Sequence, residues 1–175
     1  MQVLYSYKDC TIYKIDPQLV DTYAKEICES LDQIPLVAQH TKEQLLATKK
    51  ADKSLHHKFD HSLIALSKGR YVGVILGYER EAEGNSQYPR NSIYLSDLAV
   101  SSDFQKEGLG KFLVKSWLEY NKKVGFLKLD GRLSFSVQTN SAEWNKHVQG
   151  LYTAFGFKKI AEKKYDNRVD FVYFL

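Results

Sequence analysis

Two glycines, Gly108 and Gly110, follow a short apolar run and stand where a helical pattern begins. Glycine is a poor helix former, so a helix start that keeps two of them gains something else from them. The first turn of a helix offers unpaired backbone N–H groups and the positive end of the helix dipole, and both favour phosphate oxygens. Glycine also lets the backbone approach a phosphate without a Cβ in the way. The pattern predicts a pyrophosphate-binding turn; the alternative is that the glycines only shape a tight strand-to-helix turn.

Two common phosphate motifs do not fit this segment. No Gly-Lys-Ser/Thr stands at the spacing of a P-loop, and the chain lacks G-x-G-x-x-G and the alternating strand and helix order of a dinucleotide-binding fold. The glycine turn therefore needs a different scaffold.

The elements that position the turn follow from periodicity and from start and stop signals. A first helix is predicted at 16–31, with Asp16 as its cap and Pro17 in its first turn, and further helices at 41–52, 108–122 and 141–155. Strands are predicted at 10–15, on both sides of the turn at Lys68-Gly69, and at 92–100, 132–140, 157–165 and 169–175. This order predicts one α+β domain over residues 1–175. Its seven-stranded sheet is mostly antiparallel, and about four helices flank it. The strand–helix–strand passage from Ile93 to Val137 is predicted to be a right-handed crossover whose two strands form a central parallel pair.

Two segments carry a family resemblance. The run Gln105-Lys106-Glu107-Gly108-Leu109-Gly110 resembles the Q/R-x-x-G-x-G/A motif of the GNAT superfamily of N-acetyltransferases. The segment from Asn145 to Phe157 is similar to the family's N-x-x-A-x-x-L-Y-x-x-x-G-F pattern, with Val148 in place of the usual alanine. The two matches come in the family's order and at about its spacing. The resemblance covers nearly the whole chain, least specifically over the first 60 residues, and it implies the GNAT-like acyl-CoA N-acyltransferase fold.

The resemblance also implies a site for acetyl-CoA as co-substrate. The strand at 98–100 would lend main-chain groups to the pantetheine amides, and the Leu98 N–H would polarise the thioester carbonyl. Lys106 and Lys111 add positive charge, or are simply solvated lysines. Asn145 would hydrogen-bond the pantetheine arm, or is an ordinary helix-surface asparagine. The full set of implied cofactor residues is Leu98, Ala99, Val100, Gln105, Lys106, Glu107, Gly108, Leu109, Gly110, Lys111 and Asn145.

Three residues are candidates for the chemical step. By the resemblance, Tyr152 is the general acid that protonates the leaving thiolate; the alternative is a core tyrosine beside Leu151. A phenol has an ordinary pKa of about 10 and a thiol one of about 8.5, so the transfer needs close positioning. Asp97 and Glu79 are the carboxylates nearest the reaction by family geometry. Either acts as a base through water or merely attracts a cationic substrate, and the family often manages without a fixed base.

These residues favour an N-acetyltransferase that moves an acetyl group to a primary amine by direct attack in a ternary complex. The alternative is a non-catalytic acyl-CoA-binding or regulatory module of the same fold. The acceptor is a small-molecule or peptide amine, which the sequence leaves open.

Bulk properties set the remaining limits. The 175 residues are 43% hydrophobic, carry a formal net charge of +4 and have a pI of about 8.9. We expect a cytoplasmic protein, because the chain shows neither a signal-peptide pattern nor an apolar run of membrane-spanning length. No basic-aromatic stripe predicts nucleic-acid binding. His56, His57 and His61 are interpreted as part of a solvated loop, so no metal is expected, and exposed terminal strands leave a homodimer open.

Overall fold

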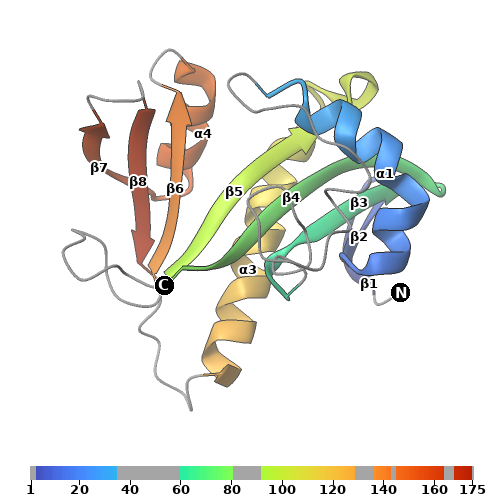
Figure 1. The fold of residues 1–175 in the computed structure, drawn as a ribbon, viewed down its shortest axis with the longest axis horizontal. Helices are drawn as coiled ribbons and strands as arrows, with labels where there is room; N and C mark the ends of the chain where they lie inside the picture. Colours follow the sequence, from blue (N-terminus) through green and yellow to red (C-terminus); the bar gives the residue numbers. More distant parts are fainter. Residues whose placement is uncertain are drawn as a thin grey trace. The chain divides into compact units, whose positions relative to one another are not determined.

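The computed structural model describes residues 3–34, 60–80, 92–128, 136–142, 145–163 and 168–174. The chain forms two compact units. Figure 1 labels the helices and strands that belong to them. The first consists of Met1–Tyr78 and Asp97–Trp117, and the second of Glu79–Ser96 and Leu118–Leu175.

Antiparallel strands form the sheet of the first unit. Their spatial order is β1-β2-β3-β4-β5, and β4 and β5 continue into the second unit. β1 pairs with β2, β2 with β3, and β3 with β4, each in antiparallel register. The strands are β1 (Val3–Tyr7), β2 (Cys10–Lys14), β3 (Leu63–Ser67), β4 (Arg70–Arg80) and β5 (Ser92–Val100).

The first of these strands corrects the sequence prediction. The described residues contain eight strands in place of the predicted seven, and β1 is the additional one. Its turn to β2 is made by Lys8 and Asp9, because Tyr7 pairs directly with Cys10. Lys8 takes the left-handed conformation, with φ of +51°. The left-handed position of such a turn usually carries glycine or asparagine, so a lysine there does not mark the turn in the sequence.

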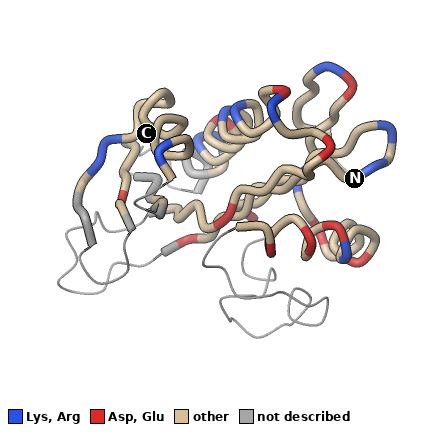
Figure 2. Tube along the Cα trace, turned by 90° about the horizontal axis from the view of Figure 1, so that it is seen from above, with Lys and Arg blue, Asp and Glu red and all other residues tan. Residues whose placement is uncertain are grey.

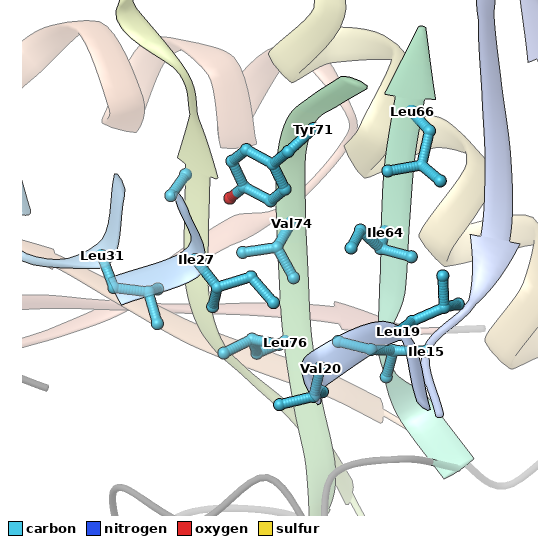
Figure 3. Packing of buried hydrophobic residues seen from close by; sticks show 11 residues of the cluster. Ile15, Leu19, Val20, Ile27, Leu31, Ile64, Leu66, Tyr71, Val74 and Leu76 are labelled. Carbon is cyan, nitrogen blue, oxygen red and sulfur yellow. The ribbon is translucent and has the colours of Figure 1, made fainter. Parts of the chain in front are cut away.

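Helix α1 (Pro17–Leu31) begins where its sequence predicts. The Asp16 carboxylate accepts a hydrogen bond from the Leu19 N–H at 2.8 Å, and Pro17 stands in the first turn, where its missing N–H costs nothing. Apolar residues of one helix face then pack on β3 and β4, with Ile27 beside Val74 (Figure 3). Each fully buried aliphatic side chain of this kind contributes roughly 1.5–3 kcal/mol. This core fixes the scaffold from which β5 runs on to the glycine turn.

The second unit contains β6 (Ser136–Ala142), α4 (Lys146–Ala154), β7 (Lys158–Lys163) and β8 (Arg168–Phe174). The strand order is β5-β6-β8-β7. β5 and β6 are parallel, with Ile93 opposite Val137, so the predicted parallel pair is confirmed. β8 is antiparallel to both of its neighbours. Helix α3 (Leu109–Lys128) is continuous and ends later than the predicted residue 122.

Helix α4 is shorter than predicted. The sequence placed its start at Ser141, but β6 continues to Ala142, which pairs with Arg168 of β8. The helix begins only at Lys146. The pairing with β8 therefore keeps Ser141 and Ala142 in the strand, and the predicted helix starts later.

Three α-helices, α1, α3 and α4, and the short 3₁₀ turn η2 (Ser102–Phe104) are assigned here in the described part of the chain. The sequence predicts four helices, and this number is not confirmed, because the helix predicted at 41–52 lies outside the described residues. His56, His57 and the predicted loop at 81–91 also lie outside them. Among the described helices, none is long and apolar enough to cross a membrane.

Candidate functional site

The glycine turn is held against the end of β5 in the first unit. The Ser101 N–H donates to the Val72 carbonyl of β4 at 2.8 Å, and the turn η2 follows directly. The Gln105 side-chain amide then reaches back and donates to the Val100 carbonyl at 3.0 Å. Gln105 therefore fixes the path of the turn with its side chain, and the Val100 carbonyl is already engaged by the protein.

Gly108 is required by the conformation of the backbone. Its φ is +85°, in the left-handed region that side chains disfavour, and Lys106 is also left-handed, with φ of +66°. Helix α3 then begins at Leu109, and its first hydrogen bond runs from the Phe112 N–H to the Gly108 carbonyl at 3.0 Å. The N–H groups of residues 109–111 precede that bond, so the helix itself supplies them with no acceptor.

Gly110 is explained neither by the backbone nor by packing. Its φ does not lie in the left-handed region, and a Cβ built on it meets no protein atom within 4 Å. Glycine in this position costs the helix about 1 kcal/mol relative to alanine. Exposed lysines stand on both sides, at positions 106 and 111. The surroundings of Gly110 thus provide what the sequence predicts for a phosphate site: main-chain donors, open space and positive charge.

The hairpin of β1 and β2 contacts this turn, which the sequence did not predict. The Tyr7 ring stacks on Phe112, with 4.7 Å between the ring centroids and 25° between the planes. The Lys8 ammonium lies 3.9 Å from the Glu107 carboxylate. The available signal for the strand was the run Val-Leu-Tyr-Ser-Tyr at 3–7, which is rich in β-branched and aromatic residues. Figure 2 shows basic residues at turns between strands and acidic residues along α1.

The cofactor segment of β5 is packed tightly on β4. A Cβ added to Gly73 would lie 2.6 Å from the Ala99 carbonyl oxygen and 3.3 Å from a methyl carbon of Leu113. Ala99 is buried, whereas Leu98 and Val100 are half-buried. In the described residues, the register of β5 with β6 runs from Ser92 to Leu95, and β5 itself goes on to Val100.

Asn145 and Tyr152 belong to the second unit, on and beside α4. Asn145 is the cap of this helix, because its side-chain oxygen accepts from the Val148 N–H at 3.2 Å. Tyr152 is 3% exposed. Its ring packs on Phe157 and Phe171, with centroid distances of 5.4 and 5.7 Å. Both residues therefore have a structural role. Asn145 caps α4, and Tyr152 is a core residue of the second unit.

The end of α4 gives a physical reason for the Gly-Phe pair of the second motif. Gly156 has φ of +89°, and the Phe157 N–H donates to the Tyr152 carbonyl at 3.1 Å. This is the usual way in which a left-handed glycine terminates a helix. Phe157 is thereby turned in against the Tyr152 ring, which fixes the orientation of that ring.

The two candidate carboxylates differ in their surroundings. Asp97 is half-buried on the part of β5 that belongs to the first unit. Glu79 is exposed, near the end of β4 in the second unit. Both residues take part in interactions with the rest of the protein.

A cavity of about 420 Å³ opens in the first unit, on the α1 side of η2. None of the predicted site residues lines it. The Arg70–Asp103 ion pair, at 3.8 Å, forms part of its wall. The other lining residues are Tyr23, Glu26, Glu29, Ser30, Gln33, Gly69, Tyr71, Ser101, Ser102 and Phe104.

The described part of the chain contains no group of three or more His, Cys, Asp or Glu residues that could hold a metal ion. The interpretation of His61 as part of a solvated loop is wrong, because His61 is buried and its carbonyl accepts a hydrogen bond from the Trp117 indole N–H. Its backbone role is therefore to anchor α3 beside β3.

Sequence comparison identifies the family. A family model described as the acetyltransferase (GNAT) family matches residues 24–157, which is most of the chain and includes both motifs. The chain belongs to the GNAT family of acetyltransferases. A comparison with curated protein sequences finds no match.

Several solved structures share this fold at low sequence identity. Ard1 from Thermoplasma volcanium is 18% identical, with a TM-score of 0.65 over 96% of this chain and 99% of that chain. NAA60 of Arabidopsis thaliana, in complex with a bisubstrate analogue, is 15% identical, with a TM-score of 0.66 over 94% of this chain and 97% of that chain. The acetyltransferase yncA of Salmonella typhimurium, described as putative and solved with acetyl-CoA, is 16% identical, with a TM-score of 0.64 over 94% and 91%.

Proposed function

We propose that this GNAT protein is an acetyl-CoA-dependent N-acetyltransferase that acts on a primary amine. The observation that carries the proposal is the open space at Gly110, beside main-chain donors of residues 109–111. These donors bind the diphosphate of acetyl-CoA, and the missing Cβ lets a phosphate oxygen approach them. Lys106 and Lys111 add positive charge at the same end of α3.

The strand β5 extends from this turn and positions the pantetheine arm and the thioester. Its main chain after Leu95 lies beyond the register with β6, so the arm adds to β5 as an extended segment does. The Leu98 N–H then donates to the thioester carbonyl and stabilises the negative charge that develops on its oxygen during attack. Gly73 supports this role, because β4 and β5 are in contact at Ala99 and the segment is rigidly held.

The chemical step is a direct transfer. The nitrogen of a neutral amine attacks the thioester carbonyl carbon, an N–C bond forms, and the C–S bond breaks. Tyr152 gives its hydroxyl proton to the leaving thiolate, and the amine proton passes to solvent or to a carboxylate. The packing of the Tyr152 ring between Phe157 and Phe171 limits its rotation, which favours accurate positioning of the hydroxyl.

Asp97 is the better candidate for the carboxylate that interacts with the acceptor amine. It is half-buried on the strand that holds the thioester, whereas Glu79 is exposed. We assign Asp97 to attraction of the cationic acceptor or to proton removal through water, and Glu79 to attraction alone. Asn145 uses its side-chain oxygen to cap α4, so its contact with pantetheine is made by the side-chain NH₂.

A screen of candidate amines with acetyl-CoA can identify the class of acceptor. Related structures include an Arabidopsis thaliana Naa50 bound to a CoA–peptide bisubstrate analogue and an aminoglycoside acetyltransferase from a soil metagenome, so both peptide and small-molecule amines belong in it. Purified protein is incubated with acetyl-CoA and each amine, and release of CoA thiol is followed. A transferase releases thiol with at least one amine above the hydrolytic background. A non-catalytic acyl-CoA-binding module binds acetyl-CoA and releases none.

Tyr152→Phe tests the general acid once an acceptor is found. We expect kcat to fall about 100-fold or more with little change in the affinity for CoA, because only the transferable proton is removed. Tyr173→Phe is the matched control, since the Tyr173 ring also packs on Phe157 in the same unit. Equal turnover of both variants and the parent would exclude Tyr152 from the chemical step.

A further inference from the structure

The tip of the β1–β2 hairpin reaches the glycine turn. Tyr7 is the last residue of β1, and its ring is stacked on Phe112 of α3. The Tyr7 hydroxyl lies 3.4 Å from the place that a Cβ on Gly108 would occupy. Phe112 is itself tied to Gly108 by the first hydrogen bond of α3. The stacking on Phe112 therefore holds the hydroxyl beside the left-handed residue of the turn.

The chemistry of this hydroxyl suits an anion. Within the described residues, it makes no hydrogen bond to the protein, and its ring is half-buried. A phenol O–H donates well to a phosphate oxygen, and hydrogen bonds to charged acceptors are stronger than those between neutral groups.

Lys8 adds a charge at the same place. Its left-handed backbone turns the side chain over the Tyr7 ring, with the ammonium 5.5 Å from the ring centroid. The ammonium also lies 3.9 Å from the Glu107 carboxylate, and both side chains are more than half exposed, at 59% and 53%. An exposed pair at that distance is weak, so a phosphate, with its larger negative charge, can displace Glu107 from Lys8.

We propose that Tyr7 and Lys8 are part of the diphosphate site: the Tyr7 hydroxyl donates a hydrogen bond to a phosphate oxygen, and Lys8 exchanges Glu107 for the same phosphate. This inference rests on the proposed use of acetyl-CoA. It gives β1, the strand absent from the sequence prediction, a direct part in cofactor binding. The turn then combines main-chain donors of α3 with two side chains from the N-terminal hairpin.

Calorimetric titration of the full chain with CoA, dephospho-CoA and pantetheine tests the assignment. Tyr7→Phe keeps the stacked ring and removes only the hydroxyl, so we expect Kd for CoA to rise about tenfold. Lys8→Met should raise it several-fold, less so at high salt, because the lost interaction is between exposed charges. Both effects should be the same with dephospho-CoA, which retains the diphosphate, and absent with pantetheine, which lacks it.

Two control variants separate this role from general effects. Tyr23→Phe removes a hydroxyl that donates to the Gly69 carbonyl at 2.7 Å, and Lys68→Met removes a charge paired with Asp9 at 3.4 Å. Both should bind CoA as the parent does. Glu107→Gln should bind CoA more tightly than the parent, because Lys8 then has no competing carboxylate.

The outcomes distinguish the two levels of the proposal. If the parent gives no heat with CoA, the proposed function is wrong and this assignment fails with it. If the parent binds CoA, and Tyr7→Phe and Lys8→Met bind it equally well, the assignment is overturned and the function stands. Losses seen with CoA but not with dephospho-CoA would place the contacts at the 3′-phosphate and would also overturn it.

Discussion

Gly108 and Gly110 stand two residues apart at the start of α3, and the structure requires only the first of them. Gly108 has φ of +85°, so its backbone conformation disfavours any side chain. Gly110 lies inside the helix with open space around the position of a Cβ. A glycine that neither conformation nor packing demands is the feature expected where a ligand approaches the backbone. This difference between the two glycines allows their roles to be separated by substitution.

Gly110→Leu should make the protein more stable and less able to bind CoA. Leucine favours the helix by up to about 1 kcal/mol relative to glycine, and its side chain occupies the approach to the N–H groups. Gly150→Leu in α4 is the matched control, because a Cβ there also meets no atom within 4 Å. Thermal unfolding and calorimetry with CoA measure the two effects. Unchanged CoA affinity in Gly110→Leu would show that no ligand approaches this point.

Gly108→Ala should lose both stability and affinity. A left-handed alanine costs about 1 kcal/mol or more, and relief of that strain moves the turn that carries the donors. Gly69→Ala introduces the same strain at φ of +77°, in the turn between β3 and β4. Both variants should have a lower Tm, and only Gly108→Ala should have a raised Kd for CoA. Equal CoA affinity in the two would contradict a role of the turn in binding.

Gly73→Ala tests the contact between β4 and β5. The added methyl would lie 2.6 Å from the Ala99 carbonyl oxygen, which is main chain and cannot rotate away. We expect a loss of about 1–3 kcal/mol in the free energy of unfolding, measured with urea, as overpacked cores show. Because Ala99 belongs to the cofactor segment, the affinity for acetyl-CoA should also fall. Wild-type stability would mean that the two strands are not in contact there.

Tyr71 should make the free energy of unfolding decrease at alkaline pH. Burial raises the pKa of its phenol above the ordinary value, and a hydrogen bond with Ser30 only partly opposes this. The native state therefore favours the neutral phenol. Its contribution is complete below the unfolded pKa of about 10 and is lost as the pH rises toward the folded pKa. Urea unfolding from neutral pH to about pH 11 should show a smaller alkaline loss in Tyr71→Phe than in the parent. Parallel curves would exclude this linkage.

Local signals in the sequence were sufficient for much of the fold. Asp16 and Pro17 mark the start of α1 because capping is decided within a few residues. The parallel pairing of β5 with β6 follows from a strand, a helix and a strand in succession. The glycine turn was found in the same way, since the motif and the helix that follows it are contiguous.

Long-range contacts account for what the sequence did not reveal. β1 was missed because Lys8 and Asp9 form its turn without glycine, and the strand is defined by pairing with β2. The start of α4 was misplaced because β8 holds Ala142 in β6. The contact of Tyr7 with Phe112 joins residues more than a hundred positions apart, and no local pattern predicts such a pair.

The most direct test of the account is an amide NMR titration of ¹⁵N-labelled protein with CoA. Donation to a phosphate oxygen moves an amide proton downfield, so the N–H signals of residues 109–111 should show large downfield shifts. Pantetheine should leave these signals unchanged while it shifts signals of β5. Binding of CoA without a shift at residues 109–111 would contradict the claim that the main chain at the start of α3 holds the diphosphate.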